Sequence, residues 1–152
     1  PHIGRALVRA GLVSTVSEAF ETYLSAHGPY YVDKMDTEVL TAIALVRDAG
    51  GVPVMAHPRS RGAAHVTDQG FLAELAAAGL AGIEVDHPDH GAADRAELRE
   101  LARHLGLIAT GSSDYHGRNK SLRVGQETST ADALAAIVAA SSGATPLLGP
   151  GA

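Results

Sequence analysis

The stretch Leu107-Ile108-Ala109-Thr110-Gly111-Ser112-Ser113-Asp114-Tyr115-His116-Gly117 joins a short apolar run to a polar loop. The apolar run predicts a buried β-strand, and the loop that follows carries Asp114 and His116. Because side chains alternate in extended backbone, these two side chains are expected to face the same way. A carboxylate and a neutral imidazole that converge in this manner can bind one divalent ion. The alternative interpretation is an exposed turn rich in Gly, Ser and Asp.

Two similar strand-and-loop segments precede this stretch. Residues 52–56 predict a strand that leads into His57-Pro58, and residues 82–86 predict one that leads into His87-Pro88-Asp89-His90. Helices are predicted over 3–10, 15–25, 36–46, 67–80 and 92–105 and from 130, with a possible final strand at 146–148. Helices that alternate with apolar strands indicate an α/β fold with a parallel sheet. The three polar segments should then lie at one edge of that sheet, at strand C-termini.

Composition limits the possible chemistry. The chain has 152 residues, 45% hydrophobic and 19% charged, which suffices for one core. The absence of Cys leaves His and carboxylate as the metal ligands. A net charge of −5 argues against broad coating of nucleic acid. No apolar run reaches about 18 residues, so we expect no membrane span and a cytoplasmic protein.

Four motifs carry a family resemblance: Ala-His-Pro at 56–58, His-Pro-x-His at 87–90, Gly-Ser-Ser-Asp-Tyr-His-Gly at 111–117 and Pro-His-Ile-Gly-Arg-Ala-Leu at 1–7. In this order they resemble the C-terminal half of PHP-domain (polymerase and histidinol phosphatase) phosphoesterases. The similar branch dephosphorylates nucleoside 3′,5′-bisphosphates and trims RNA 5′ ends. The resemblance implies the C-terminal portion of a distorted (βα)₇ TIM-like barrel. Residues 1–35 would form a helical insertion or cap, and residues 36–152 the βα units.

The same resemblance implies a site. It assigns metal binding to His57, Asp114 and His116. It places His2, Arg5, Arg59 and His90 near the phosphate and the rest of the substrate. The cofactor would be a cluster of two or three Mn²⁺, Fe²⁺ or Zn²⁺ ions, and a metal-bridged hydroxide would hydrolyse a phosphomonoester of a nucleotide or a short RNA 5′ end.

The chain departs from the family pattern in its early ligands. It contains no His-x-His, and it begins at Pro1 rather than Met. We therefore expect a missing N-terminal half of the barrel to complete these ligands, and this chain alone not to hold a full cluster.

Other charged side chains near the strand ends have two interpretations. Basic residues fall in the loops after the first and third predicted strands: Arg59, Arg61, Arg118, Lys120 and Arg123. They form either an anion-binding rim or ordinary solvated loops. Glu84, in the second strand, either binds a neighbouring Arg or backbone group or supports a metal ligand.

Two further functions remain open from the sequence. An amidohydrolase-like barrel that acts on C–N bonds also uses His and Asp at strand ends, although such a site usually includes a Lys, and no Lys lies at a strand end here. A non-catalytic PHP remnant that serves as an interaction module is the second alternative, and the missing early ligands favour it for the isolated chain.

Overall fold

The computed structural model describes residues 2–25, 27–28, 30–33, 35–60, 68–117 and 122–147. The chain divides into two compact units, Pro1–Asp36 and Thr37–Ala152, which are described separately. The sequence places its division between residues 35 and 36. The role of the first segment as an insertion or cap stays a prediction.

The first unit is a pair of short helices, α1 (His2–Arg9) and α2 (Val16–Glu21). Thr15 caps α2, because its side chain accepts the backbone N–H of Glu18. Ala19 of α2 is fully buried, and a Cβ added to Gly4 of α1 would lie 3.1 Å from Val16, so the helices pack closely at this point. Helix α2 ends earlier than residue 25, the predicted end.

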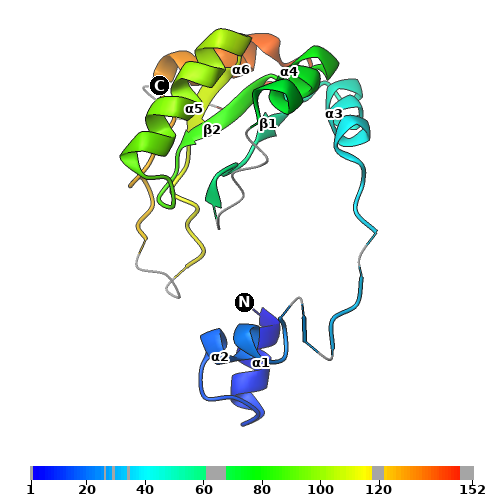
Figure 1. Cartoon of the computed structure of the whole chain (residues 1–152), viewed down its shortest axis with the longest axis vertical. Coiled ribbons are helices and arrows are strands. Elements are labelled where there is room, and N and C mark those ends of the chain that lie inside the picture. Colours follow the sequence, from blue (N-terminus) through cyan, green and yellow to red (C-terminus); the bar gives the residue numbers. More distant parts are fainter. Residues whose placement is uncertain are drawn as a thin grey trace. The chain divides into compact units, whose positions relative to one another are not determined.

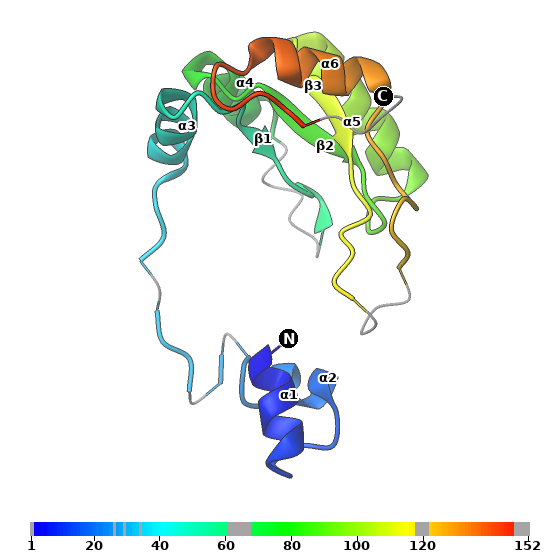
Figure 2. The same ribbon diagram turned by 180° about the vertical axis from the view of Figure 1, so that it is seen from behind.

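The second unit is a mixed α/β fold. Its elements are α3 (Val39–Asp48), β1 (Val54–Met55), α4 (Gln69–Ala78), β2 (Gly82–Asp86), α5 (Ala92–Leu105), β3 (Ile108–Gly111) and α6 (Ala131–Ala140). The three strands pair in the order β1-β2-β3, and both pairs are parallel. Figures 1 and 2 show the strands side by side with the helices of this unit grouped over them. The prediction of a parallel α/β sheet is therefore confirmed.

The structure shows a sheet rather than a barrel over the described residues. Strand β1 is shorter than the predicted strand 52–56, because in the described part of the chain β1 pairs only with β2. The possible strand at 146–148 does not form over its described residues 146 and 147, and residue 148 lies outside them. No helix among the described residues is both long and apolar enough to cross a membrane.

The core of this unit lies on one face of β2. Ile83 and Val85 are fully buried and belong to one hydrophobic cluster with leucines of α4 and α5, among them Leu72, Leu75 and Leu98. Alternation in the strand turns Glu84 to the opposite face of the sheet, although it too is buried. The helix face of β2 therefore stabilises the fold, and its other face can carry a functional group.

The chain returns alongside β3 after the polar loop. Ser112 and Thr128 form an antiparallel bridge, and Ser129 both donates to the carbonyl of Gly111 and accepts its N–H, at 3.0 Å each. A Cβ at Gly111 would lie 2.6 Å from the carbonyl oxygen of Thr128 and 2.9 Å from Cβ of Asp86. Glycine is thus required there by close approach rather than by its backbone angles.

An ion pair also ties the returning segment to helix α5. Arg95 donates two hydrogen bonds to Glu127, at 2.9 and 2.7 Å. These bonds hold the pKa of the Glu127 carboxyl below its ordinary value. The charged form of Glu127 therefore stabilises the folded state.

We predict that Gly111→Ala destabilises the protein by about 1–3 kcal/mol, because the new methyl group overlaps backbone that cannot move independently. Chemical denaturation measures the change. Gly70→Ala in α4 is the matched control, since its nearest contact is the carboxylate of Asp68 at 3.1 Å and alanine favours the helix. Equal stabilities of the Gly111→Ala variant and the wild type would contradict the close approach.

We also predict a pH-dependent effect of Glu127→Gln. A depressed carboxyl pKa contributes stability that is fully present above about pH 4.3, the pKa of an unfolded Glu, and is lost as the pH falls through the folded value. The stability difference between wild type and the Glu127→Gln variant should therefore be largest near neutral pH and shrink in acid. Unfolding curves at several pH values test this, and a difference that grows in acid would contradict it.

Candidate functional site

His57 follows β1 and has an unusual backbone conformation. Its φ is 29°, in the left-handed region. Its N–H donates a 2.6 Å hydrogen bond to Oε2 of Glu84, the carboxylate on the functional face of β2. Its Nδ1 lies 3.2 Å from the Ser60 hydroxyl. Glu84 thus binds a backbone group, the first of the two roles considered from the sequence, and stabilises the turn that presents His57.

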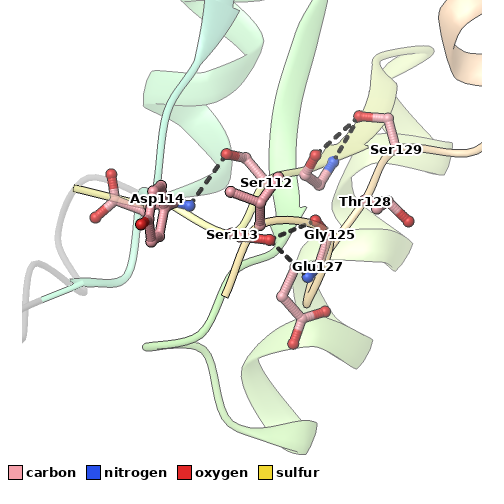
Figure 3. Close-up of a pocket in the computed structure, with 10 residues that line it drawn as sticks. Ser112, Ser113, Asp114, Gly125, Glu127, Thr128 and Ser129 are labelled. Carbon is pink, nitrogen blue, oxygen red and sulfur yellow. Dashed lines mark hydrogen bonds between the residues drawn. The ribbon is translucent and has the colours of Figure 1, made fainter. Parts of the chain in front are cut away.

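Asp114 follows β3 and has the same kind of backbone, with a φ of 45°. Its N–H donates to the Ser112 hydroxyl at 3.2 Å, a bond drawn in Figure 3. Among the described residues other than glycine, only His57 and Asp114 have positive φ. Such strain collects at functional sites and persists only where neighbouring groups hold it, so two of the three predicted metal ligands stand out by their backbone conformation.

Asp114, the other predicted metal ligand in this loop, orients the ring of His116. Its Nδ1 lies 2.7 Å from the backbone carbonyl of Asp114, and half of its side chain is exposed. A carbonyl only accepts, so Nδ1 carries the proton and the neutral ring has its lone pair at Nε2. This is the tautomer that a metal ligand needs.

His87 connects His57 and Asp114, although the sequence assigned it no role. Its ring is 2% exposed and lies 5.4 Å from the ring of His57. Its Nδ1 accepts the N–H of Asp89 at 3.1 Å, so the neutral ring carries its proton at Nε2. That Nε2 lies 3.8 Å from Oδ2 of Asp114 and finds no hydrogen-bond partner in the described part of the chain. The His-Pro-x-His spacing was the available signal.

His90 is also buried, but both of its ring nitrogens are engaged. Nδ1 donates to the carbonyl of Val85 at 2.9 Å, and Nε2 accepts the N–H of Arg59 at 3.3 Å. His90 thereby joins the end of β2 to the loop after β1. In this structure the ring holds two backbone segments together.

Arg59 faces two carboxylates of α5. Its guanidinium donates to Asp94 at 3.0 Å and also bonds Glu97. The bond from Arg59 lowers the pKa of Asp94. Arg123 is exposed in the returning segment. Three other predicted basic rim residues lie outside the described residues: Arg61, Arg118 and Lys120.

His2 and Arg5 belong to the first unit. Both lie on α1 and line a cavity of about 420 Å³ together with Arg9, so this helix presents three basic side chains to one hollow. Their predicted part in substrate binding stays a prediction.

A second cavity, of about 430 Å³, lies beside Asp114. It is lined by residues 111–115 and by residues 124, 125 and 127–129 of the returning segment (Figure 3). Figure 3 also shows the Ser113 hydroxyl bonded to the backbone of Glu127, at 2.9 Å to both N and O. This bond fixes the residue next to Asp114 on the wall of the cavity.

The predicted metal-binding side chains are of the chemical types that bind divalent ions. They comprise one carboxylate and imidazoles, and His116 has the required tautomer. The described residues nevertheless contain no group of three His, Cys, Asp or Glu side chains that are placed to hold one ion. Further donors are needed to complete a cluster.

Several curated proteins are similar to this chain in sequence. No protein-family model matches the chain. It is 42% identical over 88 residues to a phosphoribosyl 1,2-cyclic phosphate 1,2-diphosphodiesterase of Eggerthella lenta, covering 58% of the chain and 30% of the relative. It is 31% identical over 115 residues to a 3′,5′-nucleoside bisphosphate phosphatase of Chromobacterium violaceum, covering 76% and 40%. The Escherichia coli 5′-3′ exoribonuclease Rnm is 29% identical, with coverage of 76% and 39%.

Two solved structures resemble the fold. A candidate metal-dependent phosphoesterase of Bifidobacterium adolescentis matches with a TM-score of 0.82 and 34% identity, covering 93% of this chain and 50% of that one. An amidohydrolase of Chromobacterium violaceum, solved with sulfate and without metal, matches with a TM-score of 0.66 and 30% identity, covering 83% and 44%.

The chain therefore spans half or less of each of these proteins. Two of them are named for nucleotide or RNA substrates, as a nucleoside bisphosphate phosphatase and an exoribonuclease. The comparisons confirm the resemblance expected from the sequence: this chain is similar to part of a 3′,5′-nucleoside bisphosphate phosphatase, of a 5′-3′ exoribonuclease and of a metal-dependent phosphoesterase.

Proposed function

We propose that this chain supplies part of the active site of a metal-dependent phosphoesterase. The observation that carries the proposal is the meeting of His57, His87 and Asp114 at the C-terminal edge of the sheet, where the first and last are held on left-handed backbone. Parallel α/β proteins place their sites at this edge. The names of the relatives support the same reaction class.

The proposed metal ligands are His57, Asp114 and His116. When bound, divalent ions would neutralise phosphate oxygens and acidify an attacking water. In the chain itself, Glu84 and Ser112 hold the turns of the first two ligands, and the Asp114 carbonyl sets the tautomer of His116. Two or three ions of Mn²⁺, Fe²⁺ or Zn²⁺ are proposed for the complete protein.

The proposed substrate is a phosphorylated nucleotide or a short RNA 5′ end. Arg5 and His2, with Arg9 beside them, offer a basic hollow for a second phosphate. Arg59 is proposed to reach the substrate by exchanging a carboxylate of α5 for a phosphate oxygen. Contact between His90 and phosphate would likewise require one of its two backbone bonds to be exchanged.

The proposed partner of this chain is the other half of a TIM-like barrel. Among the described residues, β1 pairs with β2 alone. Helix α3, which precedes β1 in the chain, exposes four apolar side chains: Val39, Leu40, Leu45 and Val46. Such a surface suits additional βα units. A cytoplasmic location also stays a proposal from the sequence.

An amidohydrolase activity is the second candidate, because one structural relative carries that name. The test assays the complete protein on adenosine 3′,5′-bisphosphate, a 5′-phosphorylated oligoribonucleotide, p-nitrophenyl phosphate and a cyclic amide, with metal content measured by elemental analysis. Phosphate release with bound metal supports the phosphoesterase. Amide hydrolysis alone would favour the second candidate, and neither activity nor metal would favour a non-catalytic module.

We predict that His116→Ala lowers the metal content of the complete protein and abolishes nearly all phosphate release, while the folded structure persists. The half-exposed ring of His116 contributes little to the core, so only the metal loses a donor. Elemental analysis and circular dichroism measure both effects. His104→Ala, which removes an exposed imidazole from α5, is the control. Full metal occupancy in the His116→Ala variant would rule out the ligand role.

We predict that Arg5→Ala raises KM for adenosine 3′,5′-bisphosphate about 10-fold or more, because a charge-assisted contact is worth about 1.5–3 kcal/mol. KM for p-nitrophenyl phosphate should change much less, since it has no second phosphate. Arg103→Ala removes a positive charge that is paired with Glu100 on α5 and controls for net charge. Equal losses on both substrates would show that Arg5 has a structural role only.

A further inference from the structure

Helix α5 carries an arginine that contacts the loop after β2 directly and the loop after β3 through Glu127. Nε of Arg95 donates to the carbonyl of His90 at 2.9 Å, and Nη2 donates to the carbonyl of His87 at 2.8 Å. These carbonyls begin and end the loop that follows β2. The backbone position of His87 is therefore set directly by Arg95.

The same guanidinium reaches the loop that follows β3. Its two hydrogen bonds to Glu127 hold the returning segment, and the backbone of Glu127 is bonded in both directions to the hydroxyl of Ser113. Ser113 directly precedes Asp114. A continuous chain of short hydrogen bonds thus runs from the carbonyl of His87, through Arg95 and Glu127, to the neighbour of Asp114.

The shape of the guanidinium explains why this position needs arginine. Nη2 donates both to the His87 carbonyl and to the Glu127 carboxylate. Nε donates to the His90 carbonyl, and Nη1 donates to the second oxygen of Glu127. An ammonium group on a flexible stem cannot satisfy four planar contacts in these directions. The Arg95 side chain is about three-quarters buried, which limits competition from water.

We propose that Arg95 is a positioning residue that sets the distance between His87 and Asp114. This inference rests on the proposed phosphoesterase function. His87 Nε2 and Asp114 Oδ2 lie 3.8 Å apart, and His87 Nε2 has no hydrogen-bond partner among the described residues. Strand pairing holds the two loops together up to the bond from Ser112 N–H to the Asp86 carbonyl, and the link through Arg95 and Glu127 is a second connection between them beyond that point.

Helix α5 also offers a matched control. Arg99 lies one turn further along and donates two 2.8 Å bonds to the carboxylate of Asp86. Arg99→Ala removes the same charge and an ion pair of similar length, but its partner Asp86 lies in β2 and not in either loop. A comparison of Arg95→Ala with Arg99→Ala separates positioning from helix stability.

The experiment uses the complete protein and three measurements. For Arg95→Ala we expect kcat on p-nitrophenyl phosphate to fall about 100-fold, as for a misplacement of about 1 Å, with little change in KM. Added guanidinium, well below denaturing concentrations, should restore part of kcat. Deuterium exchange should rise in both segments, 87–90 and 112–116. Arg99→Ala should show none of these effects.

A double-mutant cycle tests the link through Glu127. If Arg95 acts through Glu127 on the Asp114 loop, the losses caused by Arg95→Ala and Glu127→Gln should be strongly non-additive. When Arg99→Ala replaces Arg95→Ala in the cycle, the losses in kcat caused by Arg99→Ala and Glu127→Gln should be additive.

Three results would overturn the inference: unchanged kcat per folded molecule in the Arg95→Ala variant, an equal loss in the Arg99→Ala variant, or exchange that rises in only one segment. Failure of the proposed function is distinguishable from these. If the wild type releases no phosphate, the phosphoesterase assignment is overturned, and the exchange comparison still decides whether Arg95 links the loops.

Discussion

The alternation of side chains along β2 is the constraint on which the rest of the structure depends. Ile83 and Val85 bury fully against the helices, and this burial fixes which face of the strand is the core. Glu84 must then point to the opposite face, where it accepts the N–H of His57. A shift of one residue in register would expose both apolar side chains and move the carboxylate into the core. The register of β2 therefore determines both the stability of the fold and the position of the candidate site.

Both candidate ligands that directly follow strands are held in backbone conformations that cost energy. His57 and Asp114 have positive φ, and each has its N–H bonded by a nearby side-chain oxygen. Residues other than glycine adopt this region rarely, at a cost of about 1–3 kcal/mol. The proposed hydrolytic site at this edge of the sheet explains why the fold retains these two unfavourable conformations.

Histidine has three different roles within one small region. His116 has its lone pair at Nε2. His87 has a buried Nε2 proton that faces Asp114. In His90 both ring nitrogens are hydrogen-bonded to backbone groups. The tautomers follow from the backbone partner of each Nδ1, a carbonyl for His116 and His90 and an N–H for His87. Residue type alone therefore does not distinguish a ligand from a support. Among the residues that the structure describes the set of metal-binding side chains is incomplete, and the chain spans half or less of its relatives.

The sequence by itself determined the parallel α/β order, the bounds of β2 and α5, and the strand-end positions of His57, Asp114 and His116, because apolar periodicity and turn residues are local signals. Only the tertiary structure decided the roles of His87, Arg95 and Glu127. Arg95 lies on a helix whose charge pattern predicts a solvated face, and its partners are 8 and 32 residues away. Hydrogen bonds between segments so far apart depend on how the loops close, and no local pattern in the chain encodes that closure.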